Sequence, residues 1–425
     1  MKSWKGLPLA DHKKNILLIA YHFPPLGLGG VGRPLGLFRY LPEFGYDVTV
    51  LTVRDILYPE YDHTLLDDSK TEKIIRTGSL DPSRLLYRLG FQRMPKGWGG
   101  SSRASLCYYP DAKRGWLPFA YRKAMEIIKA GEFKAVITTS PPPSAHLIGL
   151  KLKKNLGIKW IADFRDLWFS LPIEILYRTS FQRKYAQFLK RRFVENANEI
   201  VGVNRCIVDY LERGEVITNG ADPDYVKCWH ATATKKETRL VIGVLGTLSD
   251  LCPIEPLFKA VAGLIDRDGS YRDRVTIIHV GRYDAMEITD LIDRHGLRGI
   301  VCLKGYLPKG EAIRSLATAD ILYFTVRGFD SYTILPGRIF DYLSSGKPII
   351  GTVPPESDAA LLISSYSQGK AVSPDDIDGV ADFIELYSGK KETGSLIPDD
   401  RETGCDTYSV METARKYAAL LDRLT

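Results

Sequence analysis

Short apolar runs alternate with stretches of helical periodicity along most of the chain. Residues 15–21 form a near-continuous apolar run, as expected of a strand that is buried on both faces of a parallel sheet. Leu35, Phe38 and Leu41 then recur at helical spacing, and residues 47–53 form a second apolar run. This strand–helix–strand order predicts the first unit of a doubly wound α/β fold.

The same alternation continues and restarts in the second half of the chain. Apolar runs predict further strands at residues 73–77, 134–139, 159–162, 199–203, 215–218, 239–245, 275–280, 300–303 and 320–324. A turn at Asn219-Gly220-Ala221-Asp222 and a polar stretch at residues 230–238 separate the two groups of strands. We therefore predict two doubly wound, Rossmann-like domains facing across a cleft, at residues 1–228 and 229–404. An amphipathic helix within residues 405–425 is expected to pack back on the first domain.

Small and charged residues follow several predicted strands at their carboxyl ends. Gly29 and Gly30 lie in a glycine-rich turn after the first strand, and Asp163, Arg165 and Asp166 follow a later one. Open parallel sheets bind ligands at this edge. The glycines alternatively form only a flexible connection, and the charged residues an ion-paired brace of their loop. The glycine spacing does not match the dinucleotide fingerprint, so a nicotinamide cofactor is not expected.

Residues 331–350 combine a loop, a helix and a strand in a pattern that suits a phosphate group. Pro336 and Gly337 open the predicted helix, and a glycine ends it. Free N–H groups at a helix start attract anions, and Arg338 adds a positive charge beside them. Asp341, one turn further along, can accept hydrogen bonds from hydroxyl groups. Phosphate and a polyol together describe a sugar nucleotide, although any parallel α/β protein can contain such a unit.

Three further features each allow two interpretations. The segment at residues 177–198 is a predicted helix with basic and aromatic side chains, which is typical of a surface helix or of attachment to a membrane interface. His146 either packs within a helix or takes part in catalysis. Asp222 and Asp224 have the spacing of a metal carboxylate pair, but Pro223 between them favours a turn.

Composition limits the class of protein. Hydrophobic residues make up 44 % and charged residues 26 % of the 425 residues, which is ordinary for a soluble globular protein. No apolar run approaches the roughly 20 residues of a membrane span, and the first 14 residues lack a signal-peptide core. The six cysteines are scattered, which predicts reduced thiols in the cytosol. The net charge of +7 allows an anionic ligand or membrane surface, but the basic residues form no nucleic-acid-binding module.

The ordered set of motifs resembles that of the GT-B glycosyltransferases, and among them the large retaining group often called family 4. The motifs that carry this resemblance are the glycine-rich first loop, Tyr21-His22-Phe23-Pro24-Pro25, residues 163–168, Asn219-Gly220-Ala221-Asp222, Gly246-Thr247 and residues 336–348. The resemblance implies a nucleotide-sugar donor held mainly by the second domain and an acceptor held by the first. It also implies retention of anomeric configuration without a bound metal or another cofactor.

The resemblance also assigns roles to individual residues. It implies donor contacts from Gly29, Gly30, Gly246, Thr247, Arg282, Tyr306, Pro336, Gly337, Arg338 and Asp341. It places Asp163, Arg165 and Asp166 at the strand end where relatives carry a catalytic-site histidine or acid.

The chain departs from the family at two places. Relatives carry a glutamate eight positions before Asp341, where this chain has Thr333. Relatives also often carry basic residues shortly after the first strand of the second domain, where this chain has Asp250. Arg282 and Arg338 are therefore expected to neutralise the pyrophosphate.

The sequence thus predicts a cytoplasmic, metal-independent retaining hexosyltransferase. It would move a sugar from a UDP or GDP donor to a cell-surface glycan or lipid-linked acceptor. Peripheral contact with the inner face of the membrane through residues 177–198 is part of this prediction, and a nucleic-acid partner is not. Two alternatives remain open: a GT-B epimerase that acts on UDP-sugars without an acceptor, and a non-catalytic glycosyltransferase-like subunit, which Thr333 would suit.

Overall fold

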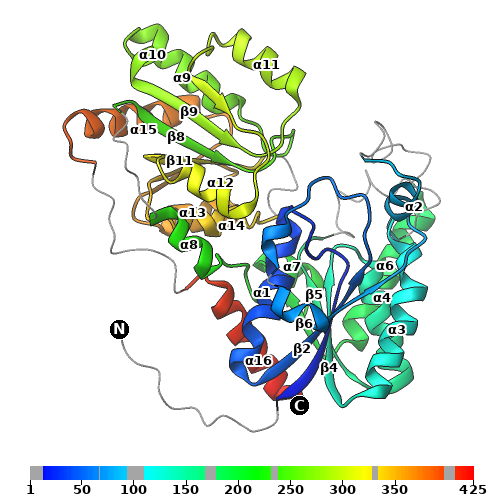
Figure 1. The fold of residues 1–425 in the computed structure, drawn as a ribbon. Coiled ribbons are helices and arrows are strands. Elements are labelled where there is room, and N and C mark those ends of the chain that lie inside the picture. Colours follow the sequence, from blue (N-terminus) through cyan, green and yellow to red (C-terminus); the bar gives the residue numbers. More distant parts are fainter. Residues whose placement is uncertain are drawn as a thin grey trace.

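Two parallel sheets with flanking helices make up the protein (Figure 1). The structure, a computed structural model, describes residues 13–66, 68–92, 110–167, 179–230, 238–327, 334–396 and 407–425, with the backbone alone at 68–70 and 230. The prediction of two Rossmann-like α/β units is confirmed.

The first sheet has seven strands in the order β3-β2-β1-β4-β5-β6-β7. Their bounds in chain order are β1 Lys14–Ala20, β2 Tyr46–Val53, β3 Ile74–Thr77, β4 Phe133–Ser140, β5 Lys159–Phe164, β6 Glu199–Gly202 and β7 Glu215–Val216. In the middle of the sheet, Ile16 of β1 is in register with Val48 of β2 on one side and Ala135 of β4 on the other. The strand order reverses between β1 and β4, and open sheets carry their ligand crevice at such a point.

Helices cover both faces of this sheet. They are α1 Gly32–Tyr40, α2 Pro82–Arg88, α3 Leu117–Ala130, α4 Ser144–Leu156, α6 Ser180–Asn196 and α7 Arg205–Leu211. A short 3₁₀ turn, η1 Gly29–Val31, directly precedes α1. The buried side chains of β1 explain its central place, since Ile16 to Ala20 are fully inaccessible to solvent. Helix α2 forms after β3 because Asp81 caps it and Pro82 occupies its first turn.

The second sheet has six strands in the order β10-β9-β8-β11-β12-β13. Their bounds are β8 Leu240–Leu245, β9 Val275–Val280, β10 Val301–Leu303, β11 Ile321–Thr325, β12 Ile349–Thr352 and β13 Gly369–Val372. Val241 and Leu245 of β8 belong to one apolar core, and Ile242 and Val244 to a second one, so the sheet is buried on both faces. Its strand order reverses between β8 and β11.

The helices of the second half are α8 Pro223–His230, α9 Glu255–Arg267, α10 Tyr271–Arg274, α11 Ala285–Arg294, α12 Lys309–Leu316, α13 Arg338–Leu343, α14 Asp358–Ser365 and α15 Ile377–Glu392. Helix α8 packs against α12, and Trp229 of α8 joins a core of the second sheet. The predicted domain limits at residues 228 and 404 stay predictions.

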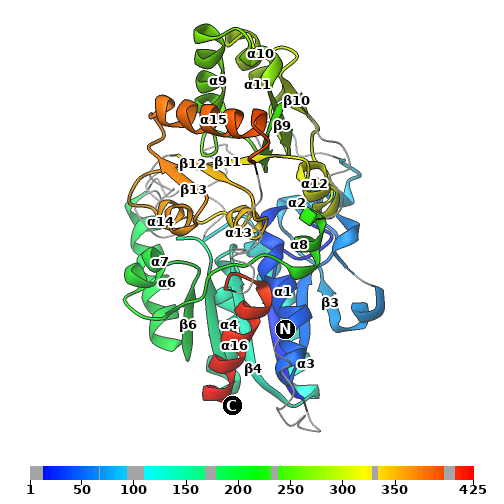
Figure 2. The same ribbon diagram turned by 90° about the vertical axis from the view of Figure 1, so that its left-hand side faces the viewer.

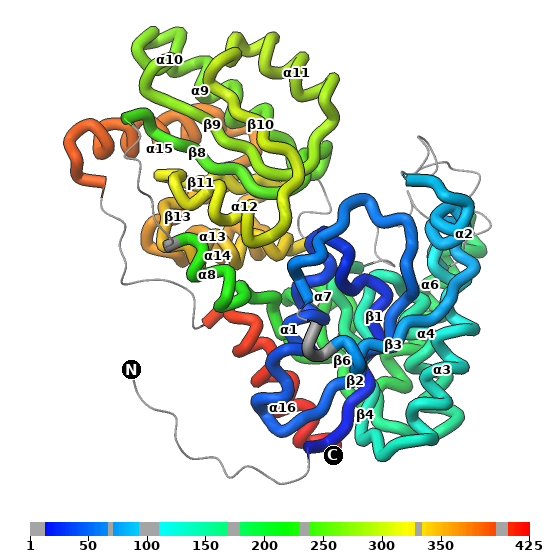
Figure 3. The backbone as a smooth tube through the Cα atoms, viewed as in Figure 1, coloured from blue at the N-terminus to red at the C-terminus, as the bar shows by residue number. Residues whose placement is uncertain are grey.

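The last helix, α16 Val410–Leu424, lies against α1 of the first sheet (Figure 2). Ala414, Tyr417 and Leu421 join the apolar core that β1 and α1 build. Figure 3 shows the consequence for the chain path: the red end of the tube returns to the half that the blue end began. Among the helices described, none is long and apolar enough to cross a membrane.

Candidate functional site

Loops from the carboxyl ends of the two sheets meet at three points. The contacts are a hydrogen bond of 3.0 Å from the Tyr306 hydroxyl to the Gly27 carbonyl, one of 2.8 Å from the Lys309 backbone N–H to the Asp62 carboxylate, and an ion pair of 3.2 Å between Arg282 Nε and Glu60 Oε1. The ligand-binding edges of both sheets therefore lie at the boundary between the two halves. Arg282 and Tyr306, which were predicted to hold the donor, take part in these contacts, and Arg282 pairs with Glu60.

Arg338 lies at the reversal point of the second sheet. Its Nη2 donates a hydrogen bond of 2.7 Å to the carbonyl of Thr325 at the end of β11, and its guanidinium carbon lies 5.1 Å from the centre of the Phe324 ring. On the other side, a Cβ atom added to Gly246, just after β8, would come within 2.6 Å of Arg338 Nη1. No carboxylate among the described residues forms an ion pair with Arg338, so its positive charge is available to an anion.

Three glycines shape the backbone beside Arg338. Gly246, Gly281 and Gly305 have φ angles of +111°, +149° and +70°, a region that other residues rarely adopt. A Cβ atom on Gly281 would lie only 2.0 Å from the Gly246 carbonyl oxygen. His279 supports this packing through a contact of 2.8 Å between its Nε2 and the same oxygen. The glycines at the ends of β8 and β9 thus permit close packing against each other and against the Arg338 side chain.

The start of helix α13 differs from the prediction for residues 331–350. Helix α13 begins at Arg338, with Gly337 as its N-cap, so Pro336 lies before the helix and not in its first turn. The helix has six residues, too few for a strong dipole, because Gly346 turns the chain at φ +72° soon after it. Attraction of an anion therefore depends on the Arg338 side chain more than on the helix start.

Asp341 is buried and already has a partner. Its carboxylate pairs with the ammonium group of Lys309, from the first residue of α12. Burial raises the pKa of Asp341, and the charge of Lys309 opposes that shift. The predicted hydrogen bonds to ligand hydroxyls would have to compete with this pair. Thr333, the position of the missing family carboxylate, lies outside the described residues.

Three of the predicted donor residues border open space. Apart from its own chain neighbours, no described residue comes within 4 Å of the position that a Cβ would take at Gly29 or at Gly337, and Thr247 is exposed. These residues leave room for a ligand, although none of them shows a contact that would identify one.

Arg165 lies at the reversal point of the first sheet. Its guanidinium donates hydrogen bonds to three backbone carbonyls, those of Gly30, Ser140 and Pro141. It therefore joins the first loop to the end of β4. Its side chain is buried, and among the described residues no carboxylate lies within ion-pair distance of it.

Asp163 does not face this crevice. It is fully buried and forms an ion pair of 2.9 Å with Arg33 of α1, and it accepts a hydrogen bond of 2.7 Å from Thr139. The hydroxyl of Tyr417 in α16 accepts a further bond of 3.0 Å from Arg33. Burial alone raises the pKa of Asp163, but Arg33 and the hydrogen bonds outweigh burial, so this pKa lies below its ordinary value. Asp163 thus braces α1 and α16, and the expected Asp–Arg–Asp cluster does not form.

Asp166 and His146 have opposite surroundings. Asp166 is half-buried, forms no hydrogen bond with a described residue, and has a pKa that burial raises. His146 is fully buried against the ring of Phe164, at 4.3 Å, and its Nδ1 lies 2.8 Å from Thr138 Oγ1. His146 is therefore a packing residue, whereas Asp166 remains accessible to a ligand.

Sequence reasoning missed Lys309 and Asp62. Lys309 contacts Asp62, 247 residues away in the chain, and Asp341, 32 residues away. No local sequence pattern reveals contacts between such distant residues.

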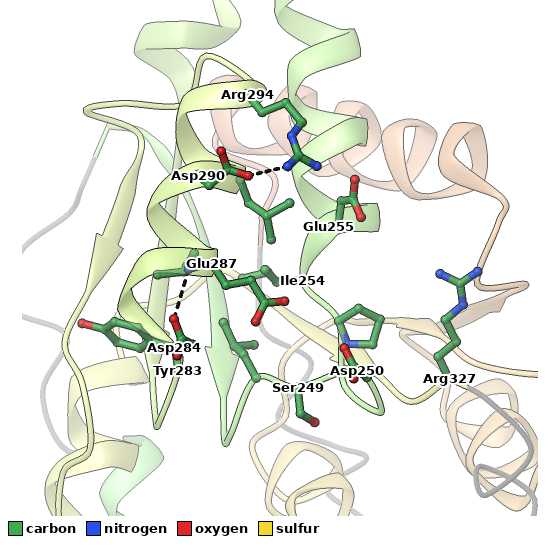
Figure 4. Close-up of a pocket in the computed structure, with 14 residues that line it drawn as sticks. Ser249, Asp250, Ile254, Glu255, Tyr283, Asp284, Glu287, Asp290, Arg294 and Arg327 are labelled. Carbon is green, nitrogen blue, oxygen red and sulfur yellow. Dashed lines mark hydrogen bonds and ion pairs between the residues drawn. The ribbon is translucent and has the colours of Figure 1, made fainter. Parts of the chain in front are cut away.

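A cavity of about 440 Å³ lies beside this site, between α9 and α11 (Figure 4). Most of its charged lining is acidic, as Asp250, Glu255 and Glu287 illustrate, while Arg294 is paired with Asp290. None of the predicted donor residues lines it. Such a lining disfavours a pyrophosphate, so this cavity does not suit the phosphates of a nucleotide.

The paired aspartates of the turn after β7 do not form a metal site. Asp222 accepts hydrogen bonds from Arg39, at 2.7 Å, and from the Tyr40 hydroxyl, at 2.9 Å. Within the described part of the chain, no group of three or more potential metal ligands lies together.

The chain was compared with known protein families, curated proteins and solved structures. Residues 29–220 match the family described as glycosyl transferase 4-like domain. Among curated proteins, no sequence matches the chain.

Solved structures share the whole fold. Sucrose-phosphate synthase from Thermosynechococcus elongatus aligns with a TM-score of 0.66 at 16 % identity, over 97 % of this chain and 99 % of that one. WaaG, a glycosyltransferase involved in lipopolysaccharide biosynthesis, aligns with a TM-score of 0.62 at 14 % identity, over 96 % and 99 %. A trehalose-6-phosphate structure from E. coli, bound with UDP-2-fluoro glucose, aligns with a TM-score of 0.65 at 11 % identity, over 97 % and 100 %. The resemblance to the GT-B glycosyltransferases is confirmed by this shared fold and by the match of residues 29–220 to the glycosyl transferase 4-like domain.

Proposed function

We propose that the protein is a retaining glycosyltransferase that moves a hexose-type sugar from a UDP or GDP donor to a glycan or lipid-linked acceptor. The observation that carries this proposal is the guanidinium of Arg338, which has no ion-pair partner among the described residues. It lies at the reversal point of the second sheet, beside glycines at the ends of β8, β9 and β10. In an α/β sheet, this is where the phosphates of a nucleotide bind.

The proposed role of Arg338 is to stabilise the charge that develops on the leaving nucleotide during sugar transfer. As the bond between the sugar and the phosphate breaks, negative charge grows on the leaving nucleotide. A donor group that is already held in place stabilises that charge without reorganisation. Arg338 is held in this way by the Thr325 carbonyl and the Phe324 ring. We assign no step to a metal ion or cofactor.

The acceptor would bind to the first half, at Gly29, Gly30, Arg165 and Asp166. The contacts of Tyr306, Lys309 and Arg282 with the first half would hold the two halves closed and exclude water during transfer.

Peripheral contact with a membrane is a second part of the proposal, and α6 supports it. The helix buries one stripe, formed by Gln182, Ala186, Leu189 and Phe193. The adjacent stripe turns outward: Phe181 is 75 % exposed and Phe188 50 % exposed, and both rings stack on Tyr185 at 6.3 and 5.8 Å. The aromatic residues of this helix therefore divide between the core and the surface, because the two stripes are one residue apart.

Basic residues accompany this aromatic ridge, which consists of Phe181, Tyr185 and Phe188. The guanidinium of Arg192 lies 5.7 Å from the centre of the Phe188 ring, and Lys184 is exposed. Aromatic rings with basic neighbours suit the interface of an anionic lipid layer. This would place the enzyme at the inner face of a membrane, where lipid-linked acceptors are found.

The test is binding and turnover with a panel of UDP- and GDP-sugars. We expect one donor to raise the melting temperature, and the same donor to lose its sugar to an acceptor or slowly to water. Conversion of the sugar in the absence of acceptor would indicate an epimerase instead. Donor binding with neither conversion nor transfer by any acceptor would favour the non-catalytic subunit, and failure of every donor to bind would refute the proposal.

A further inference from the structure

Lys309, the first residue of α12, contacts both halves of the protein. Its backbone N–H donates a hydrogen bond of 2.8 Å to the Asp62 carboxylate in the first half. Its ammonium group pairs with the Asp341 carboxylate of α13 in the second half. The two bonds use different parts of the same residue, so a change of the Lys309 side chain removes one of them and leaves the other.

The Asp62 side of this connection is fixed to the loop that follows β1. Asp62 is 2 % exposed, and its other carboxylate oxygen accepts hydrogen bonds from the backbone N–H and the hydroxyl of Thr64, at 2.9 and 2.6 Å. The backbone N–H of Asp62 donates a hydrogen bond of 2.8 Å to the carbonyl of Pro25. The start of α12 is therefore bonded to a carboxylate that the first half holds in place.

The Asp341 side of the connection depends on Lys309 for its charge. Asp341 is buried, and the negative charge of Asp222 adds to the cost of ionising it, whereas the ammonium of Lys309 opposes that cost. A buried carboxylate that loses its counterion is strongly destabilised. Asp341 lies three residues after Arg338, so less than one turn of α13 joins the two. The position of Lys309 therefore affects the helix that carries Arg338.

We propose that Lys309 is a positioning residue that transmits the contact between the halves to Arg338. While Asp62 holds the start of α12, the Lys309 side chain is placed to hold Asp341, and α13 is fixed. When that contact is lost, the pair loosens and α13 with it. The inference rests on the proposed transferase function, because α13 carries the guanidinium that would meet the donor phosphates. Coupling between two distant points needs a physical element that both of them bias, and the two bonds of Lys309 supply it.

Each bond of Lys309 can be removed alone. Asp62→Ala removes the bond to the first half. Lys309→Met removes the pair with Asp341, while its backbone N–H keeps the bond to Asp62. Glu60→Ala is the matched control, because it breaks the ion pair between the halves that Arg282 forms outside α12. The measurement is hydrogen exchange of the backbone amides of residues 336–346, followed by mass spectrometry without any ligand.

We expect Asp62→Ala to speed exchange in residues 336–346 about tenfold, which is the effect of one hydrogen bond, although Asp62 lies in the other half. Lys309→Met should speed it to at least the same extent, Lys309→Arg should recover most of the loss, and Glu60→Ala should change nothing. The double variant Asp62→Ala/Lys309→Met should exchange no faster than Lys309→Met, because both changes interrupt one connection. If Lys309→Met does not fold, the comparison of Asp62→Ala with Glu60→Ala still decides.

Nucleotide binding supplies a second measurement. Removal of the negative charge of Asp62 would by itself favour an anionic ligand, whereas loosening of Arg338 weakens its binding. We therefore expect Asp62→Ala to raise the dissociation constant of the UDP- or GDP-sugar that wild type binds, as measured by calorimetric titration.

Two results would overturn the inference. One is exchange in residues 336–346 that Asp62→Ala leaves unchanged, or that the two substitutions speed independently, so that their effects multiply in the double variant. The other is a dissociation constant that Asp62→Ala leaves unchanged or lowers. Absence of nucleotide-sugar binding to wild type would instead refute the transferase proposal. The exchange measurement needs no ligand, so it would still decide whether Lys309 connects the halves.

Discussion

At the scale of single residues, partners distinguish structural charges from functional ones. Asp163, Arg282 and Asp341 each have an ion-pair partner, whereas Arg338, Arg165 and Asp166 have none within the described part of the chain. A charge withdrawn from water without a counterion costs free energy that a ligand can recover. Residues of identical type in the same motifs therefore have different roles.

Arg338→Ala should weaken donor binding. A hydrogen bond to a charged group contributes about 1.5–3 kcal/mol, so we expect the dissociation constant to rise roughly 10- to 100-fold. Calorimetric titration with the best nucleotide sugar measures it. Arg267→Ala, at an exposed position at the end of α9, is the control and should change nothing. Equal affinities of wild type and Arg338→Ala would remove Arg338 from the donor site.

Asp163→Asn should destabilise the fold and not merely reduce activity. It leaves the buried charge of Arg33 uncompensated, which costs about 3–5 kcal/mol in the free energy of unfolding. Urea unfolding measures this loss, and the double variant Arg33→Met/Asp163→Leu should recover part of it. A variant as stable as wild type would contradict the bracing role.

The same pair predicts a dependence on pH. The pKa of Asp163 is lowered in the folded state, so its contribution to stability is fully present above the unfolded value of about 3.9. It should be lost as the pH falls below about 4 and the carboxylate becomes protonated. Unfolding at a series of pH values should therefore show a smaller acid-induced loss in the double variant than in wild type.

At the scale of elements, α6 and α16 show how one helix can present two surfaces. Helix α16 buries Ala414, Tyr417 and Leu421 in the core of the first sheet although it follows the second sheet in the chain. Helix α6 buries one stripe and exposes its aromatic ridge. Exposed rings cost solvation free energy unless something covers them, which makes the ridge informative about a partner.

Phe181→Ser and Phe188→Ser should weaken binding to vesicles of equal parts phosphatidylcholine and phosphatidylglycerol. Each ring that enters the interface contributes about 1.5 kcal/mol, or roughly tenfold in affinity. Co-sedimentation with the vesicles measures this loss of binding. Added salt should weaken binding further, because it screens the attraction between the basic residues and the anionic lipid. Met286→Ser, at an 85 % exposed position of the second half, is the matched control. If Phe181→Ser and Phe188→Ser both bind the vesicles as strongly as wild type, the aromatic ridge is not the membrane contact.

At the scale of the whole molecule, closure depends on few contacts between the halves. The Asp62 carboxylate is buried and joins the start of α12, while Arg282 and Glu60 form a partly exposed pair, which contributes little. The closed arrangement thus depends more on Asp62 and Tyr306 than on the ion pair.

Asp62→Ala should open the cleft in the absence of donor. Small-angle scattering should report a larger radius of gyration, and saturating donor should restore the compact form. Thr64→Val removes a local bond to Asp62 but keeps the contact with Lys309, so it should stay closed. Equal opening of both variants would assign the effect to the loop itself.

The sequence by itself determined the local features of this protein. Apolar runs identified the central strands, and capping and turn residues identified most helices, because strand burial and helix periodicity act over a few neighbours. The ordered set of motifs, from the glycine-rich first loop to residues 336–348, was enough to indicate a GT-B glycosyltransferase.

Tertiary structure alone decided which of the predicted residues are available to a ligand. It paired Asp163 with Arg33, Asp341 with Lys309 and Arg282 with Glu60, and it gave Arg338 no ion-pair partner among the described residues. These pairs join residues 130, 32 and 222 positions apart. Ion pairing depends on distance in space, so the sequence could nominate the charged residues at each strand end but could not tell which charges were already neutralised.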